Sequence, residues 1–159
     1  MKNRAGFTLI ELMVVIGIMG ILGATSVGFL AKYRQRTVGS EATVMMKQLL
    51  EAEIIYFLAH EEFFPAHPGP GNEIWIYNDG GGTSAPDQQR ALDALKVAIP
   101  TGHLLDFHVY RMDDGDPVTV DPVTVEIYSA GNFDLFPGVP RIKGTVDKTG
   151  KMTGPTPFP

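Results

Sequence analysis

The chain opens with a long, uninterrupted run of apolar residues. This run extends from Phe7 to Ala31, contains no proline and holds a single charged residue, Glu11. As a helix it would be about 37 Å long at a rise of ~1.5 Å per residue, enough to cross the ~30 Å apolar core of a bilayer. The pattern therefore predicts one membrane-spanning helix at the start of the chain.

An amphipathic helical pattern follows directly after this run. Apolar residues recur at alternating spacings of four and three, which places them on one helical face; they are Val38, Ala42, Met45, Leu49, Ala52, Tyr56 and Ala59. Polar residues such as Lys47, Glu51 and Glu53 are expected off this face. Because Pro65 cannot continue a helix, we expect the last helical residue at about His60. The pattern predicts one long helix whose second half packs on the chain's own domain.

The remaining residues predict a small sheet with one short helix. Apolar and β-branched residues indicate strands at 73–77, 104–112, 118–128 and 141–146, and the spacing of leucines predicts a helix at 86–99. Pro117 and Pro122 would make the strand at 118–128 irregular or an edge strand. We expect the proline-rich tail at 154–159 to be poorly ordered. The predicted fold class is α+β, with a long N-terminal helix packed on a small antiparallel sheet.

Composition narrows the classes of function. The net charge of −5 argues against a general nucleic-acid binder, which normally carries a basic surface, so no nucleic-acid partner is expected. The chain contains no cysteine, so disulfides cannot stabilise it. No Gly-x-Ser-x-Gly motif and no phosphate-binding loop occur. We expect no enzymatic activity.

Positive charges flank the apolar run on both sides. Lys2 and Arg4 precede it, and three basic residues follow it, Lys32, Arg34 and Arg36. The distribution of charge therefore does not determine the orientation of the helix in a membrane. An ordinary secretory signal peptide is the plain alternative, but the run is longer than the core of such signals and contains a carboxylate.

The string Gly6-Phe7-Thr8-Leu9-Ile10-Glu11 stands between a short basic leader and the apolar run. With these features the start of the chain resembles the precursor signature of the type IV pilin superfamily. The resemblance covers roughly the first forty residues. It implies that a membrane prepilin peptidase cuts between Gly6 and Phe7 from the cytoplasmic side and N-methylates the new amine of Phe7. It also implies the pilin-like form of the predicted fold.

The resemblance implies a structural role. The chain would polymerise with identical subunits into a type IV pilus-like filament, with an inner-membrane assembly platform and minor pilins as further partners. The precursor would lie in the bacterial inner membrane with its C-terminal domain outside, and the filament would be extracellular or periplasmic. The expected segments are a leader, a filament-core helix, its amphipathic continuation and a globular domain, at 1–6, 7–31, 32–62 and 63–159.

Two other functions remain open from the sequence. One is a major pseudopilin, which would form a short periplasmic filament in a type II secretion system. The other is a monomeric envelope protein that is held by one N-terminal anchor and binds a ligand through its sheet domain. The single carboxylate in the apolar run argues against the second alternative, because a plain anchor has no use for it.

The carboxylate of Glu11 has a physical role in this interpretation. Cleavage would leave a positive amine on Phe7 in or at the edge of the membrane, where an unpaired charge is unfavourable. Glu11 lies about one helical turn away and could neutralise this amine or that of a neighbouring subunit. The predicted assembly residues are therefore Phe7, Thr8 and Glu11. The alternative is a carboxylate that reaches outward to the membrane surface without a specific partner.

Small residues form a second feature of the apolar run. Gly20, Ala24 and Gly28 share one helical face at four-residue spacing, which allows close approach of another helix. Many filaments of the pilin family unwind this region of the helix, so the resemblance implies local unwinding between Gly20 and Gly28. This chain has Gly28 where a proline is common in the family.

An acidic cluster occurs late in the chain, at Asp113, Asp114, Asp116 and Asp121. Asp-Gly pairs are first of all turn residues, so we interpret the cluster as a turn. Calcium binding is the alternative, because major pseudopilins often hold this ion in a C-terminal loop, although the EF-hand pattern is not met. No other cofactor is expected.

Overall fold

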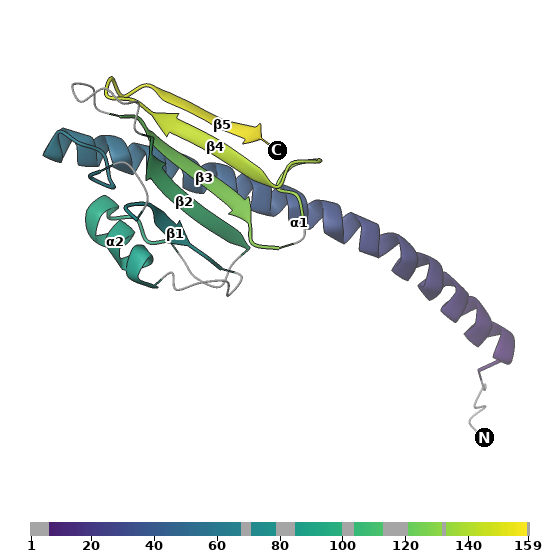
Figure 1. Cartoon of the computed structure of the whole chain (residues 1–159). Coiled ribbons are helices and arrows are strands. Elements are labelled where there is room, and N and C mark those ends of the chain that lie inside the picture. Colours follow the sequence, from purple (N-terminus) through teal and green to yellow (C-terminus); the bar gives the residue numbers. More distant parts are fainter. Residues whose placement is uncertain are drawn as a thin grey trace. The chain divides into compact units, whose positions relative to one another are not determined.

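One long helix, α1, spans Leu9–His60 and takes part in two compact units of the chain. The first unit is Met1–Arg34 and the second is Gln35–Pro159. The computed structural model describes residues 7–67, 71–78, 85–99, 104–112, 121–131 and 133–158 (Figure 1). Every residue from 7 to 34 is exposed, and α1 is long and apolar enough to cross a membrane.

Helix α1 is continuous across the glycine-containing region and ends where the sequence predicts. The local unwinding expected between Gly20 and Gly28 is therefore not present in the single chain. At the other end, Glu61 adopts a positive φ of 61°, and its N–H donates to the Phe57 carbonyl at 2.8 Å. A left-handed residue closes the last helical turn, so the helix stops before Pro65 is reached.

The second half of α1 buries one stripe of side chains. Val38, Ala42, Leu49 and Ala52 are buried, which confirms most of the predicted face. The stripe is wider than the pattern indicated, because two further side chains are fully buried, Met46 and Leu50, whereas Ala59 is exposed. This half of the helix also approaches the chain closely at Gly39, where an added Cβ would collide with the backbone carbonyl of Leu135.

A five-stranded antiparallel sheet packs on this half of the helix, which confirms the α+β fold class (Figure 1). The strands are paired in chain order, and they are β1 (Ile74–Ile76), β2 (Leu105–Arg111), β3 (Val123–Ser129), β4 (Arg141–Val146) and β5 (Met152–Phe158). A short helix, α2 (Ala85–Leu95), lies beside β1. Each strand pairs with the next strand along the chain, and α2 lies in the connection between β1 and β2.

The core lies between α1 and the inner face of the sheet. Alternate residues of the strands point to this face and are fully buried, namely Ile74, Ile76, Leu105, Phe107, Val109, Val123, Val125, Ile127, Ile142 and Val146. At Gly144, an added Cβ would lie 2.8 Å from the Met46 sulfur and 2.9 Å from Leu50 Cδ1. The missing side chain therefore lets α1 approach the sheet closely at β4.

The outer face of the sheet carries a stack of aromatic rings. The ring of Trp75 lies 3.7 Å from that of His108, which in turn stacks on Tyr110 at 4.3 Å. Tyr110 donates a hydrogen bond to Glu126 at 2.8 Å, and the hydroxyl of Tyr128 donates to the same carboxylate. Burial between the rings lowers the pKa of His108 below its usual range. The two tyrosine hydroxyls of this face thus share one carboxylate, whereas Nδ1 of His108 is buried without a hydrogen-bond partner among the described residues.

Both edges of the sheet lack free backbone donors at specific positions. At the β1 edge, the N–H of Trp75 donates to the carboxylate of Asp87 on α2 at 2.9 Å. At the β5 edge, Pro155 and Pro157 have no N–H to offer. Each device removes a donor that an additional strand would need for pairing.

Three details of the predicted sheet domain are wrong. The short helix ends at Leu95 rather than at 99, because Lys96 adopts a positive φ of 58°. Strand β3 is the central strand rather than an edge, since Pro122 precedes it and leaves its ladder intact. The C-terminal tail is ordered as β5, where the Phe158 ring lies 4.2 Å below the Arg141 guanidinium. A cation–π contact of this kind favours the strand over a free tail.

Glu53 is buried, contrary to the expectation that it lies on the solvent side of the helix. Its Oε2 accepts a hydrogen bond from the Phe64 N–H at 3.0 Å, while Oε1 has no hydrogen-bond partner among the described residues. Burial raises the pKa of Glu53 to about 8. Nearby, the buried guanidinium of Arg111 donates to the Ala66 carbonyl at 2.5 Å and lies 3.7 Å from Asp121. These polar contacts fasten the segment after α1 to the domain.

The pKa of Glu53 predicts how stability depends on pH. Below the ordinary Glu pKa of 4.5 the carboxyl is protonated in both the folded and the unfolded chain. As the pH rises toward about 8, the unfolded chain ionises first, so the free energy of unfolding falls. At pH 7 this loss is about 3 kcal/mol. Glu53→Gln keeps the acceptor for Phe64 and cannot ionise, so it should remove this loss.

The measurement is unfolding of the full-length chain in detergent at pH 5 and pH 8, followed through the signal of Trp75, the single tryptophan. The variant should be less sensitive to pH than the unaltered chain and more stable at pH 8. Glu51→Gln, an exposed position on the same helix, is the control and should change neither property. An unchanged pH dependence in Glu53→Gln would contradict the prediction.

Candidate functional site

The first turn of α1 is closed by hydrogen bonds between Thr8 and Glu11. Oε2 of Glu11 accepts from the Thr8 N–H at 2.8 Å and from the Thr8 hydroxyl at 2.6 Å. In return, the Glu11 N–H donates to the Thr8 hydroxyl oxygen at 3.3 Å. This reciprocal arrangement is a capping box, which satisfies backbone donors that a helix start otherwise leaves open.

The capping box orients the carboxylate of Glu11. Among the described residues, Thr8 alone donates to this carboxylate, and both hydrogen bonds end on Oε2. The other oxygen, Oε1, therefore keeps its capacity to accept a hydrogen bond or to meet a positive charge. Both partners lie on the C-terminal side of the Gly6–Phe7 bond, so the box does not depend on residues 1–6.

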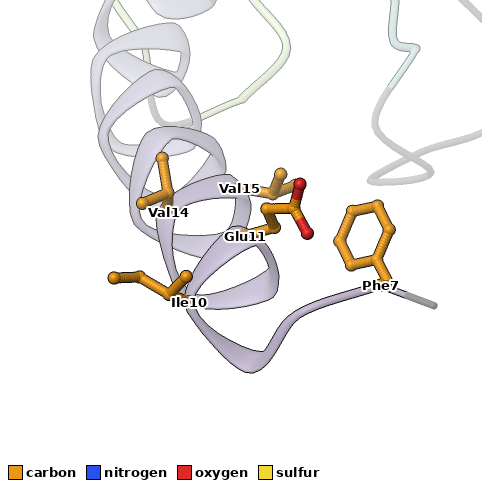
Figure 2. A pocket seen from close by; sticks show the side chains of 5 residues that line it. All are labelled: Phe7, Ile10, Glu11, Val14 and Val15. Atoms are coloured by element: carbon orange, nitrogen blue, oxygen red, sulfur yellow. The ribbon is translucent and has the colours of Figure 1, made fainter. Parts of the chain in front are cut away.

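Around Glu11 the surface is apolar. A shallow hollow is lined by Phe7, Ile10, Glu11, Val14 and Val15. Figure 2 shows the carboxylate of Glu11 pointing toward the ring of Phe7, with Ile10 and Val14 on another side of the helix. The carboxylate is exposed in the single chain, and its charge would become unfavourable in lipid or in a filament core unless a group of opposite sign approached it. The geometry suits a single cation arriving at the start of the helix.

The rest of the first helical half presents apolar side chains on every side. Leu12, Ile16, Met19, Leu22 and Phe29 are each more than half exposed. On the face formed by Gly20, Ala24 and Gly28, a Cβ added at either glycine would meet nothing within 4 Å. The space needed for a closely packed second helix is therefore open on this face.

Some predicted site residues lie outside the described part of the chain. These are Gly6 on the leader side of the predicted cleavage site and three residues of the acidic cluster, Asp113, Asp114 and Asp116. The fourth member, Asp121, is buried beside Arg111. The described residues contain no group of three or more acidic, His or Cys side chains that could hold a metal. Calcium binding at this cluster stays a prediction.

Thr8 and Glu11 were predicted as site residues, but the hydrogen bonds between them were not predicted. A threonine followed three residues later by a glutamate, just before an apolar run, is the sequence signal of a capping box. That signal is present here and could have identified the helix start at Leu9. It also assigns Thr8 a definite contact, which the resemblance alone did not supply.

The start of the chain matches a known family description. Residues 1–27 match the prokaryotic N-terminal methylation motif. This region contains Phe7, Thr8 and Glu11, the three residues around which the candidate site is built. No solved structure matches the chain significantly.

Several curated proteins are similar to the chain. The type IV major pilin protein PilA of Myxococcus xanthus (strain DK1622) is 40% identical over 62 residues, which cover 39% of this chain and 28% of that protein. A fimbrial protein of Neisseria meningitidis serogroup B (strain ATCC BAA-335 / MC58) is 42% identical over 99 residues, which cover 62% of this chain and 52% of that protein. The type IV major pilin protein PilE1 of Neisseria gonorrhoeae is 36% identical over 83 residues, which cover 52% of this chain and 33% of that protein.

The chain thus spans about half or less of the length of these relatives. Their names describe pilin and fimbrial proteins, in agreement with the expectation that the chain is not an enzyme. The fold also agrees, since a long N-terminal helix packs through its second half on an antiparallel sheet. In its methylation motif, in its curated relatives and in its fold, the chain is therefore similar to type IV pilins.

Proposed function

We propose that the chain is a structural subunit that polymerises into a type IV pilus-like filament. The observation that carries this proposal is the first half of α1, an apolar helix whose residues up to position 34 are all exposed in the described part of the chain. Such a surface needs either lipid or other copies of the same helix around it. This helical half would be surrounded by lipid in the precursor and by other subunits in the filament.

Processing prepares the subunit for assembly. In this proposal a prepilin peptidase cuts between Gly6 and Phe7, and the new amine of Phe7 becomes N-methylated. The matched methylation motif supports both steps. Because Glu11 keeps Oε1 available beside Phe7, it can receive the positive amine of a neighbouring subunit. Pairing of the two charges in the apolar filament core would set the axial position of each subunit against the next.

The other partners and the location follow from the same proposal. The precursor lies in the bacterial inner membrane with residues 63–159 outside, and the assembly platform in that membrane and minor pilins take part in polymerisation. The finished filament is extracellular. The names of the similar proteins, which are pilins and fimbrial proteins, favour a pilus over the pseudopilus of a type II secretion system.

The proposed processing can be tested by mass spectrometry of the N-terminal peptide from the native cells. We expect a peptide that begins at Phe7 and carries one added methyl group. Replacement of Gly6 by a bulky residue such as leucine should leave the precursor uncut, whereas Ala5→Leu, one position away, is the matched control. A start at Met1 or after Ser26 in the unaltered chain would instead indicate a simple anchor or a secreted domain.

The charge of Glu11 can be separated from its capping role. Glu11→Gln keeps an oxygen that accepts from both Thr8 donors but removes the negative charge. We expect the variant precursor to remain stable in the membrane while the yield of sheared filaments falls about tenfold or more, because the partner amine is left unpaired. A normal filament yield from Glu11→Gln would remove charge pairing from the proposal.

The capping role of Thr8 can be tested by hydrogen exchange. Thr8→Val keeps the shape of the side chain but removes the hydroxyl that makes two of the three hydrogen bonds. Loss of a helix cap should weaken the first turn by a factor of about five, visible as faster hydrogen exchange of its backbone amides in detergent. Thr8→Ser keeps the hydroxyl and serves as the control. Equal exchange rates in the two variants would show that the box does not hold the helix start.

A further inference from the structure

A short segment with two cations and one aromatic ring follows the apolar run of α1. Its residues are Lys32, Tyr33 and Arg34, which we call the exit segment, and all three belong to the first unit of the chain. Each of them is exposed, and Tyr33 is 69% exposed. Tyrosine is enriched where the apolar core of a bilayer meets the headgroups, and long basic side chains extend from helix ends toward the headgroups. The exit segment therefore has the composition of a helix that leaves a bilayer.

The spacing between Glu11 and the exit segment matches the thickness of a bilayer core. Lys32 follows Glu11 by 21 residues, and α1 is helical without a break over this stretch. At a rise of ~1.5 Å per residue, the two charged positions are about 32 Å apart along the helix, against ~30 Å for the apolar core. No charged residue lies between them in the sequence. When Lys32 lies at one boundary of the core, Glu11 lies at the other.

The charges of the exit segment select the kind of headgroup. Lysine and arginine side chains only donate hydrogen bonds, and the planar guanidinium of Arg34 suits two oxygens of one phosphate. Glu11 is the single acidic residue of the first unit, and it lies at the far end of the apolar stretch. The attraction of a protein to anionic lipid increases with each basic residue close to the membrane surface. The segment therefore favours an anionic headgroup over a zwitterionic one.

The remainder of the chain has the opposite charge balance. Residues 35–159 contain seventeen acidic and nine basic residues. A surface rich in anionic lipid repels a domain with net negative charge. Attraction to such a surface is thus limited to the basic residues that directly follow the apolar run.

We propose that the exit segment binds the headgroups of anionic phospholipids in the outer leaflet of the inner membrane. This inference rests on one part of the proposed function, the precursor that lies in that membrane with residues 63–159 outside. Lys32 and Arg34 contact the phosphates, and the ring of Tyr33 lies between the headgroups and the acyl chains. The contact holds the helix at a depth that places Glu11 at the inner boundary of the core, and it must break when the subunit leaves the membrane.

Native mass spectrometry of the full chain measures the selectivity for lipid. The chain in detergent is mixed with dioleoyl phosphatidylglycerol or with dioleoyl phosphatidylcholine, which share their acyl chains and differ in headgroup charge. At equal lipid concentration we expect about threefold or more bound phosphatidylglycerol than phosphatidylcholine. Equal binding of the two lipids would overturn the inference.

A double substitution assigns the selectivity to the exit segment. Lys32→Gln combined with Arg34→Gln removes both charges and should lower the ratio of the two bound lipids about twofold or more. The basic leader residues Lys2 and Arg4 are present in both proteins, so they do not contribute to this difference. Lys32→Arg combined with Arg34→Lys keeps both charges and should keep the ratio. An unchanged ratio in the neutral variant would show that the selectivity arises elsewhere and would contradict the proposed site.

The matched control removes two charges from the sheet domain. Lys148→Gln combined with Lys151→Gln changes two exposed residues between β4 and β5 and should leave the lipid ratio unchanged. The near-ultraviolet signal of Trp75 checks that the domain stays folded in every variant. An equal fall in the ratio for the control and the neutral variant would mean that net charge alone determines binding, and the inference would fail.

Photo-cross-linking tests the contact in cell membranes. Benzoylphenylalanine in place of Tyr33 keeps an aromatic group at this position, and the adducts of the membrane-held chain are identified by mass spectrometry after irradiation. We expect phospholipid adducts in which anionic headgroups exceed their share of the total lipid extract. Adducts with a protein alone, lipid adducts in the proportions of the extract, or no adduct would each overturn the inference.

The outcomes separate the inference from the proposed function, because both readouts use the chain in detergent or in a membrane and need no filament. If anionic lipid binds as expected but the native cells form no filament, the proposed polymerisation fails and the lipid contact stands. If processed subunits form filaments but the neutral variant keeps its lipid selectivity, the inference fails and the proposed function stands.

Discussion

The organisation of this protein depends on one constraint, an apolar helical surface that the described residues of the chain leave exposed. From residue 7 to residue 34 every position is exposed, whereas the second half of α1 buries a stripe against the sheet. The domain needs only this second half for its core. In the proposed function, this first half is covered by lipid or by other subunits, and the carboxylate of Glu11 would pair with the amine of one neighbour.

Much of the fold could be predicted because its signals are local. The boundary of α1 at His60, the strands around Trp75 and Val109 and the antiparallel sheet follow from periodicity and from turn residues. The order of the tail did not follow, because β5 depends on pairing with β4 and on the contact of Phe158 with Arg141. A sequence rich in proline indicates disorder by composition, and only tertiary contacts reverse that indication.

The candidate site shows the same division. Thr8 and Glu11 could be named from their positions, and the capping-box signal could also have predicted the hydrogen bonds between them. The burial of Glu53 could not be predicted in this way. It follows from the width of the buried stripe on α1 and from the return of the chain at Phe64. A shallow hollow lined by Ile55 of α1 and Leu95 of α2 likewise combines residues about forty positions apart, which no local pattern connects.

The edges of the sheet limit the ways in which such subunits can associate. Asp87 occupies the outward N–H of Trp75 on β1, and Pro155 and Pro157 withhold donors on β5. Lateral growth of the sheet from one molecule to the next is thereby disfavoured at both ends. In the proposed filament, contact between subunits would therefore rely on the helices rather than on pairing of sheet edges.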